Sequence, residues 1–318
     1  MLGQEFMRQL VGVARESARQ SERILSDATP QYHEVISWGR EDIDIANEQD
    51  VMEKISALKP SVIFNCAAYN NVDKAEDELE IANAINGEAV GYIASAAGVI
   101  GATLVHFSTD YVFGGNLPLT ESYAAAHDSV TAGYTEQDLP DPISAYGQSK
   151  ALGEQRILNN LITHQLNNFY IIRTSKLFGP PGIGGGSKKS FPEMMLGFAR
   201  EKGRIEAIDG EVGSPTYVRD LVEATLELAG VACESARRRS LSAATPGIYH
   251  ITNSGSCTWY EYAKAAVEYA GVQAEVVPVG ADRFPRKAKR PACVVLINTK
   301  LQPLRSWQDA LREFLVQG

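Results

Sequence analysis

The chain has 318 residues, 44% of them hydrophobic and 22% charged, which is enough for one large globular domain or two. Its net charge of −9 argues against nucleic acid as a partner, because phosphate binding draws on an excess of basic residues. The four cysteines are scattered, which predicts neither disulfides nor a metal site and fits a reducing cytoplasm. Nothing in the sequence is typical of a signal peptide or a membrane span, so we expect a cytoplasmic protein with no membrane partner.

The first half of the chain alternates between helical and strand-like patterns. Apolar residues at helical spacing predict helices, and runs of β-branched residues predict short buried strands. In chain order the predicted elements are a helix at 3–25, a strand at 34–37, a helix at 48–58, a strand at 61–66, a helix at 78–97, a strand at 103–107, a helix at 144–165 and a strand at 168–174. This alternation indicates βαβ units. We therefore predict an α/β fold with a Rossmann-like, doubly wound parallel sheet.

The pattern changes after Leu177, where shorter elements follow a loop rich in Gly, Pro and Lys. The predicted elements there are helices at 191–202, 217–229, 258–269 and 306–316 and strands at 205–209, 247–252 and 276–279. We predict that residues 1–177 form a dinucleotide-binding domain and that residues 178–318 form a smaller α+β lobe that predominantly binds substrate.

Tyr146 and Lys150 are the most informative pair in the sequence. They lie four residues apart in a predicted helix, so their side chains share one face. An ammonium about 4 Å from a phenolate contributes up to about 4 kcal/mol at a surface-like dielectric, which lowers a phenol pKa of about 10 by up to about three units. We therefore expect a tyrosine that exchanges its proton near neutral pH. The alternative is an ordinary amphipathic helix that exposes both side chains.

Two other groups follow predicted strands, at the sheet edge where ligands bind in open parallel sheets. Ala67-Ala68-Tyr69 offers small residues against which a flat ring can lie. The alternative is that the two alanines are core residues at the end of a strand. Ser108-Thr109-Asp110-Tyr111 offers hydroxyls, or simply a turn cap. A hydroxyl, a tyrosine and a lysine around one site are what carbonyl reduction requires, with the hydride supplied by a nicotinamide.

Together these motifs resemble those of the dTDP-4-dehydrorhamnose reductases, which are extended short-chain dehydrogenases/reductases. The matching pieces span nearly the whole chain in the family's order: Asn65-Cys66-Ala67-Ala68-Tyr69, Val72-Asp73-Lys74-Ala75-Glu76, Ser108-Thr109-Asp110-Tyr111-Val112-Phe113, Tyr146-Gly147-Gln148-Ser149-Lys150, Arg173-Thr174-Ser175, Gly213-Ser214-Pro215-Thr216 and Arg290-Pro291. The resemblance implies reduction of the 4-keto group of a dTDP-linked deoxysugar with NADPH or NADH, in the synthesis of nucleotide sugars for cell-surface polysaccharides.

The resemblance also implies roles for individual residues. Tyr146 would donate the proton, Lys150 would be its partner, and Thr109 would hydrogen-bond the keto group. The cofactor contacts expected, besides Tyr146 and Lys150, are Leu2, Gly3, Asp44, Ile45, Ala67, Ala68 and Tyr69. The substrate contacts expected are Val72, Thr109, Asp110, Tyr111 and Lys176. No metal ligand is predicted.

Two further assignments come from charge. Arg40 follows the predicted strand 34–37, where NAD-binding proteins tend to place an acidic residue, and an arginine there can accept a 2′-phosphate. This favours NADPH, with NADH still open. Arg290, with the basic stretch 283–289, is predicted to bind the substrate's diphosphate, which prefers arginine. The alternative is a solvated basic loop.

Three features depart from the family's pattern. The family starts with a β-strand and a Gly-x-x-Gly-x-x-Gly loop that holds the pyrophosphate at a helix N-terminus, and Met1-Leu2-Gly3-Gln4 matches only the tail of that loop. From this we expect the natural product to begin upstream, the alternative being a chain that has lost tight cofactor binding. Lys176 replaces a usual tryptophan, which leaves the exact sugar open. Residues 117–135 resemble an insertion, predicted to be a solvated loop.

Other functions remain open at this point. The chain resembles in part a non-catalytic regulatory subunit that binds a nucleotide sugar or dinucleotide, like the subunit that partners methionine adenosyltransferase. The missing glycine loop favours that reading, and the retained Thr109, Tyr146 and Lys150 favour the enzyme. An epimerase or dehydratase is less favoured, because Thr109-Asp110 is followed by Tyr111 and not by Glu. A homodimer is also left open.

Overall fold

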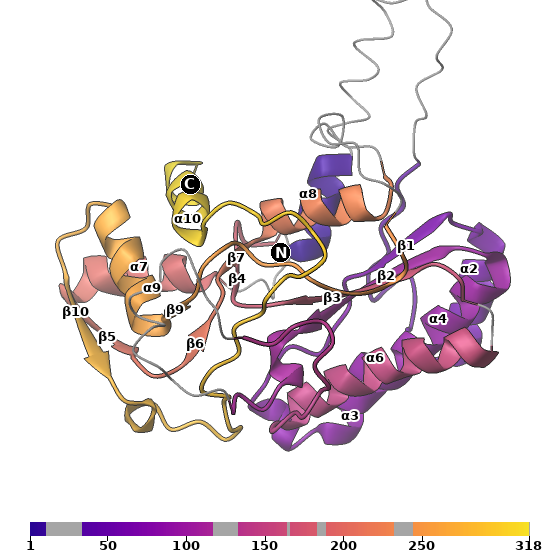
Figure 1. The fold of residues 1–318 in the computed structure, drawn as a ribbon, viewed down its shortest axis with the longest axis horizontal. Coiled ribbons are helices and arrows are strands. Elements are labelled where there is room, and N and C mark those ends of the chain that lie inside the picture. Colours follow the sequence, from indigo (N-terminus) through magenta and orange to yellow (C-terminus); the bar gives the residue numbers. More distant parts are fainter. Residues whose placement is uncertain (11–33, 117–132, 164–165, 183–188, 232–243, 318) are drawn as a thin grey trace, which may run out of the picture.

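The fold is built on a four-stranded parallel sheet. The computed structural model describes residues 1–10, 34–116, 133–163, 166–182, 189–231 and 244–317. The strands lie in the order β1-β2-β3-β8, and each neighbouring pair is parallel. Their bounds are β1 Val62–Asn65, β2 Thr103–Thr109, β3 Phe169–Thr174 and β8 Gly247–His250. Figure 1 shows helices on both sides of this sheet, which confirms the predicted α/β, Rossmann-like architecture.

Each face of the sheet has its own apolar core. The helices α2 (Glu48–Leu58), α4 (Ala89–Ile100) and α6 (Ala145–Thr163) cover one face, and the helical residues 2–10 with α8 (Val218–Leu228) cover the other (Figure 1). Successive strand residues point to opposite faces. Leu104 accordingly packs with the first group of helices, and Val105 packs with the second. Because the parallel sheet is covered on both faces, its strands are continuous apolar runs in the sequence.

The predicted helix at 78–97 is interrupted in the structure. It consists of α3 (Leu79–Asn83), a π-helical turn at Ala84–Glu88, and α4. The turn directs the buried side chain of Asn86 inward, where its Nδ2 donates to Ser149 Oγ of α6 at 2.9 Å and to the Tyr69 carbonyl at 3.0 Å. A Cβ on Gly153 of α6 would stand 2.2 Å from the Asn86 carbonyl, so this glycine permits the close approach. Such π-turns frequently occur at functional sites.

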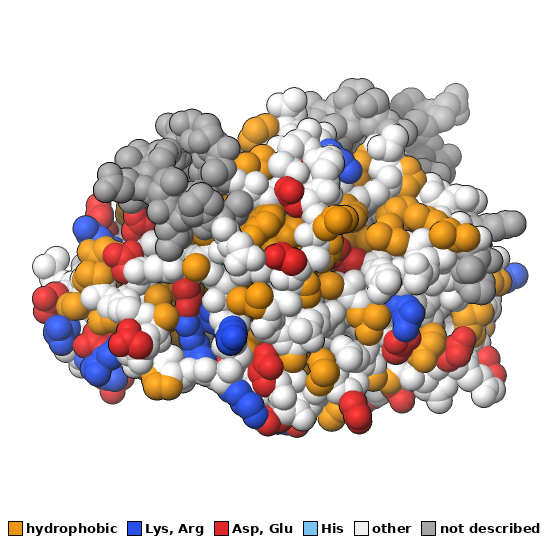
Figure 2. Space-filling view, turned by 60° about the horizontal axis from the view of Figure 1, so that its bottom comes forward, with side chains coloured by type: hydrophobic (Ala, Val, Ile, Leu, Met, Phe, Trp, Pro, Cys, Tyr) orange, Lys and Arg blue, Asp and Glu red, His pale blue; other side chains and the backbone are white. Residues whose placement is uncertain are grey.

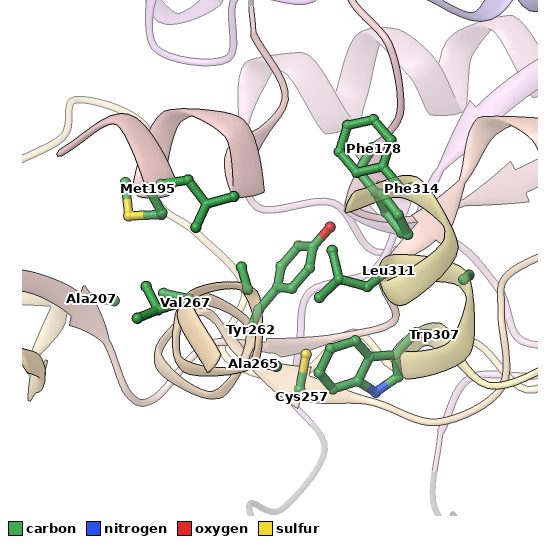
Figure 3. Close-up of a cluster of buried hydrophobic side chains, with 14 of the residues drawn as sticks. Phe178, Met195, Ala207, Cys257, Tyr262, Ala265, Val267, Trp307, Leu311 and Phe314 are labelled. Atoms are coloured by element: carbon green, nitrogen blue, oxygen red, sulfur yellow. The ribbon is translucent and has the colours of Figure 1, made fainter. Parts of the chain in front are cut away.

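The rest of the chain builds a smaller, mixed unit. It contains α7 (Phe191–Lys202), α9 (Trp259–Tyr269) and α10 (Trp307–Gln317), and β5 (Arg204–Ile208) pairs in parallel with β10 (Glu275–Val279). Figure 3 shows its core, in which Tyr262 of α9 lies among Trp307, Leu311 and Phe178. The rings of Tyr262 and Trp307 meet edge to face at 5.6 Å. Among the described residues, none of the helices has the length and apolar character needed to cross a bilayer.

Two pairs of short strands beyond residue 176 were not predicted. β4 (Leu177–Phe178) pairs with β7 (Thr216–Tyr217), and β6 (Val212–Gly213) pairs with β9 (Cys257–Thr258). The chain also returns to the large sheet at β8, although β8 lies beyond residue 177. The smaller lobe is therefore not one continuous segment, and the boundary at 177 stays a prediction.

The predicted strand at 34–37 is wrong. Residues 34–39 have no regular secondary structure, and β1 is the edge of the sheet on this side among the described residues. A cavity of about 550 Å³, lined by both Val35 and Val62, lies between the segment and β1. A strand needs a neighbour for its backbone hydrogen bonds, and across this cavity the segment has none. The predicted helix at 3–25 is helical at residues 2–10, and the rest of it, like residues 117–132 of the predicted loop, lies outside the described residues.

Candidate active site

A cavity of about 240 Å³ lies at the carboxyl ends of β2 and β3. This is the edge at which open parallel sheets bind ligands. Six of the residues predicted for the site line it: Val72, Thr109, Asp110, Tyr111, Tyr146 and Lys176. They come from four separate parts of the chain, so the fold brings the predicted motifs together.

A chain of hydroxyl groups runs along one wall of this cavity. Thr109 Oγ1 donates to Asp110 Oδ1 at 2.9 Å, and Ser175 Oγ donates to Asp110 Oδ2 at 2.5 Å. The Tyr146 side chain lines the same cavity. Burial raises the pKa of Asp110 to about 6, so its carboxyl takes up a proton under mildly acidic conditions. The Thr109 hydroxyl must turn away from Asp110 before it can donate to a substrate oxygen.

The expected lowering of the Tyr146 pKa by Lys150 is not found. Burial, with the negative charge of Asp110, instead raises the pKa of Tyr146 to about 12. The cause is the direction of the lysine: its Nζ donates to the Phe107 carbonyl on β2. Tyr146 therefore keeps its proton at neutral pH, as a proton donor must.

The start of α6 is packed tightly against the end of β2. A Cβ on Gly147 would stand 2.2 Å from the Tyr111 carbonyl, so only glycine allows this approach. The Gly147 N–H donates to Ser144 Oγ at 3.1 Å, which fixes the first turn of the helix. As a result the Tyr111 and Tyr146 rings meet edge to face with their centroids 5.8 Å apart.

Lys176 lies at the far wall with two partners that the sequence did not reveal. Its backbone has φ +42°, which is rare for a residue with a side chain. Its Nζ donates to the carbonyls of Cys257 at 2.9 Å and Glu211 at 3.2 Å and lies 4.3 Å from the centroid of the Trp259 ring. Trp259 Nε1 in turn donates to Glu211 Oε2 at 3.2 Å, and Arg286 pairs with the same carboxylate. Trp259 and Glu211 line the cavity, and their only sequence signal was a tryptophan at a helix start.

The basic stretch is paired with acidic residues, in part those of the first lobe. Arg290 Nη2 pairs with Asp73 Oδ2 at 2.9 Å, and Lys287 pairs with Asp77. Figure 2 shows acidic and basic side chains intermixed over the face that it presents. Pro291 lines the cavity, whereas Arg290 is not part of its wall. A diphosphate contact by Arg290 stays a prediction, and it would have to compete with Asp73.

The residues predicted for the cofactor are spread over a second region. Gly3, Ile45 and Ala67 line the larger cavity beside β1. A Cβ on Gly3 would stand 3.6 Å from Cys66 Cβ, so the helix that begins at residue 2 starts against the end of β1.

The other predicted cofactor residues lie around this region. Leu2 packs against the apolar core that the helical residues 2–10 share with α8. Ala68, which follows β1, is half-buried. Tyr69 donates from its hydroxyl to Glu78 Oε2 at 2.7 Å. Arg40 and Asp44 lie in exposed turns, and Asp44 caps its own turn by accepting from the Ala46 N–H at 3.0 Å.

Comparison with known proteins shows which family the chain belongs to. The family model described as "RmlD substrate binding domain" matches residues 21–318. The chain belongs to this family, that of the dTDP-4-dehydrorhamnose reductases. The resemblance seen in the motifs is thereby confirmed.

Family members are similar over most of their length. The chain is 36% identical to the spore coat polysaccharide biosynthesis protein SpsK of Bacillus subtilis, over 89% of this chain and 88% of that protein. It is 35% identical to a dTDP-4-dehydrorhamnose reductase of Mycolicibacterium smegmatis, over 92% of this chain and 80% of that protein. The crystal structure of the Bacillus anthracis dTDP-4-dehydrorhamnose reductase in complex with NADP matches with a TM-score of 0.76 and 30% identity, over 98% of this chain and 96% of that one.

Proposed function

We propose that this protein is an NADPH-dependent reductase of the 4-keto group of a dTDP-linked deoxysugar that serves polysaccharide synthesis. The observation that carries the proposal is that Thr109 and Tyr146 line one cavity at the carboxyl edge of a parallel sheet. The reductases among its relatives, and the NADP bound to the Bacillus anthracis protein, support the same reaction and cofactor.

The residues present fit a nicotinamide cofactor. The first turn of the helix at residues 2–10 abuts the end of β1, and unpaired N–H groups at a helix N-terminus attract phosphates. Ala67 follows β1 with a small side chain and lines the same cavity as Gly3 at this helix start. When bound, NADPH supplies the hydride that reduces the carbonyl carbon.

The chain's own residues supply the proton and hold the carbonyl. Tyr146 retains its phenolic proton at neutral pH because burial raises its pKa, and it gives this proton to the carbonyl oxygen. Thr109 hydrogen-bonds the same oxygen once its hydroxyl leaves Asp110. Lys150 would contact the cofactor, because its Nζ turns to the Phe107 carbonyl and does not lower the pKa of Tyr146.

The sugar would contact the opposite wall. Thr174 Oγ1 is buried in the cavity lining without a hydrogen-bond partner, which is costly unless a ligand supplies one. Val72, Tyr111 and Lys176 also line the cavity, with Trp259 as an additional flat surface. Aromatic faces and hydroxyl partners of this kind are suited to a sugar ring.

A turnover assay tests the proposal. The purified chain is mixed with NADPH and dTDP-4-dehydrorhamnose, and the product is identified by its mass, which should rise by two hydrogens. dTDP-glucose, which has no keto group, is the control and should cause no NADPH consumption. Binding of both ligands without turnover would instead favour the non-catalytic subunit.

Replacing Lys176 with methionine should weaken substrate binding. The change keeps the length of the side chain but removes two hydrogen bonds and the charge over Trp259. Both bonds are made to carbonyls of the protein itself, so their loss alters the cavity wall around Lys176. We expect the KM for the nucleotide sugar to rise about fivefold, the value of about one hydrogen bond. The KM for NADPH should stay within about twofold of wild type, and a larger effect on NADPH than on the sugar would contradict this placement of Lys176.

Two attributes complete the proposal. A cytoplasmic location fits a biosynthetic enzyme that uses NADPH, and fractionation of cells would test it. A homodimer is proposed as well, and analytical ultracentrifugation of the purified chain would distinguish it from a monomer.

A further inference from the structure

Behind the Tyr146 site, three polar side chains form a row that is sealed from solvent. Asn65 lies at the end of β1, His106 in the middle of β2, and Lys150 on α6, with exposures of 5%, 0% and 2%. His106 faces α6 because strand side chains alternate: Val105 and Phe107 point to the opposite face of the sheet. Nothing in the reaction derived so far uses His106.

The hydrogen bonds of Asn65 determine which ring nitrogen of His106 carries the proton. The Ala67 N–H donates to Asn65 Oδ1 at 3.2 Å, which identifies that atom as the amide oxygen. The amide nitrogen Nδ2 is then 3.2 Å from His106 Nδ1. Because an amide NH₂ group only donates, Nδ1 must accept, and the proton of the neutral ring is on Nε2. Burial holds the pKa of His106 well below its usual value, so the ring is neutral.

This tautomer presents a donor to Lys150. His106 Nε2 is 3.5 Å from Lys150 Nζ. An ammonium has only donors, so the charged form of Lys150 faces another N–H, whereas the uncharged amine has a lone pair that accepts it. The row therefore stabilises the uncharged amine.

The remaining groups around Lys150 do not offset this preference. The Phe107 carbonyl accepts a hydrogen bond from Nζ in either form, since the uncharged amine also has N–H groups. Cys66, at the end of β1, stays a neutral thiol because burial raises its pKa to about 12. Glu154, one turn along α6, is bound by Arg173 and Ser108, which compensates its charge. With burial as the main cause and Glu154 opposing it, the pKa of Lys150 is lowered to about 8.

We propose that His106 is a positioning residue that sets the pH at which Lys150 loses its charge, by donating a hydrogen bond from Nε2 to Nζ. The inference rests on the proposed function only for the use that the enzyme makes of Lys150. Since Lys150 is expected to contact the cofactor, kcat/KM for NADPH should decline as pH rises past about 8, and His106 sets that limit.

The tautomer of His106 is the first test, and it needs no substrate. Nitrogen-15 NMR of the wild-type imidazoles distinguishes Nε2–H from Nδ1–H, and the signal of His106 is the one missing from a His106→Phe spectrum. We expect Nε2–H. A ring protonated on Nδ1, or on both nitrogens at neutral pH, would overturn the proposal whatever the enzyme does.

The second test reverses the donor. In Asn65→Asp a carboxylate can only accept, so His106 must move its proton to Nδ1 and turn a lone pair toward Lys150. We expect the alkaline limb of the kcat/KM profile to move up by about one pH unit, which is a tenfold change in proton affinity. NMR of the same variant should show the switched tautomer.

A double variant separates this effect from the added negative charge. If His106 transmits the change, Asn65→Asp made in the His106→Phe background should no longer move the limb relative to His106→Phe alone. A shift of equal size in that background would overturn the proposal. Absence of turnover in the wild type would count against the proposed function, while leaving the tautomer test intact.

Discussion

We expect Tyr146→Phe to lower kcat by about two to four orders of magnitude, which is the usual contribution of a positioned acid. The phenol lines the same cavity as Thr109 and holds its proton at neutral pH, and phenylalanine removes only the hydroxyl group. The KM for NADPH should change by no more than about twofold. Stopped-flow measurement of NADPH consumption at saturating substrate gives the comparison.

Tyr111→Phe is the matched control for that variant. Tyr111 lines the same cavity and touches the Tyr146 ring, and burial raises its pKa as well. If Tyr146 is the donor, Tyr111→Phe should cost less than about tenfold in kcat. A larger loss in Tyr111→Phe than in Tyr146→Phe would mean that Tyr111, and not Tyr146, donates the proton.

The second large effect concerns stability. Glu154→Gln should lower the free energy of unfolding by about 3–5 kcal/mol, out of the about 5–15 kcal/mol typical of a domain. Glu154 accepts from Arg173 Nη2 at 2.7 Å and from Nε at 3.0 Å, and the two side chains are only 3% and 1% exposed. Glutamine keeps the shape but leaves a buried guanidinium without its counter-charge. Urea unfolding at pH 7 measures the loss.

The chain offers an exposed pair of the same type as a control. Arg156 and Glu88 also pair through the guanidinium, but their side chains are 38% and 40% exposed. Water screens such a pair, so Glu88→Gln should cost about 0–1 kcal/mol. Similar losses in the two variants would mean that the burial of Arg173 is not what makes its pair important.

Much of the fold follows from local patterns. The runs at 61–66 and 103–107 were predicted because a strand buried on both faces must be apolar throughout, and they are found as β1 and β2. The strand at 34–37 failed for a non-local reason, since its residues favour a strand but no neighbour is there to pair with them. The π-helical turn at Ala84–Glu88 was missed because the apolar spacing continues through it.

The candidate site was predictable where a sequence motif follows a predicted strand. Thr109, Asp110 and Tyr146 meet because parallel strands end at one edge of a sheet. The direction of Lys150 was not predictable, because it depends on a carbonyl acceptor from β2. Alternation along β2 would have placed His106 toward α6, although its partners come from distant parts of the sequence.

The partners of Lys176 are likewise non-local. Trp259 and Glu211 are 83 and 35 residues away, and only the packing of the second lobe joins them to it. A lysine in place of tryptophan signalled a change at this wall without indicating what replaces the ring. The structure shows Trp259 supplying an aromatic surface from another element.

The most direct test follows the hydride itself. NADPH that carries deuterium at the transferable position of its nicotinamide C4 is incubated with the purified chain and dTDP-4-dehydrorhamnose. The sugar product is then examined by proton NMR. The account predicts one deuterium at C4 of the sugar and loss of the C4 proton signal. Product without deuterium at C4, or no product from a folded chain that binds both ligands, would contradict it.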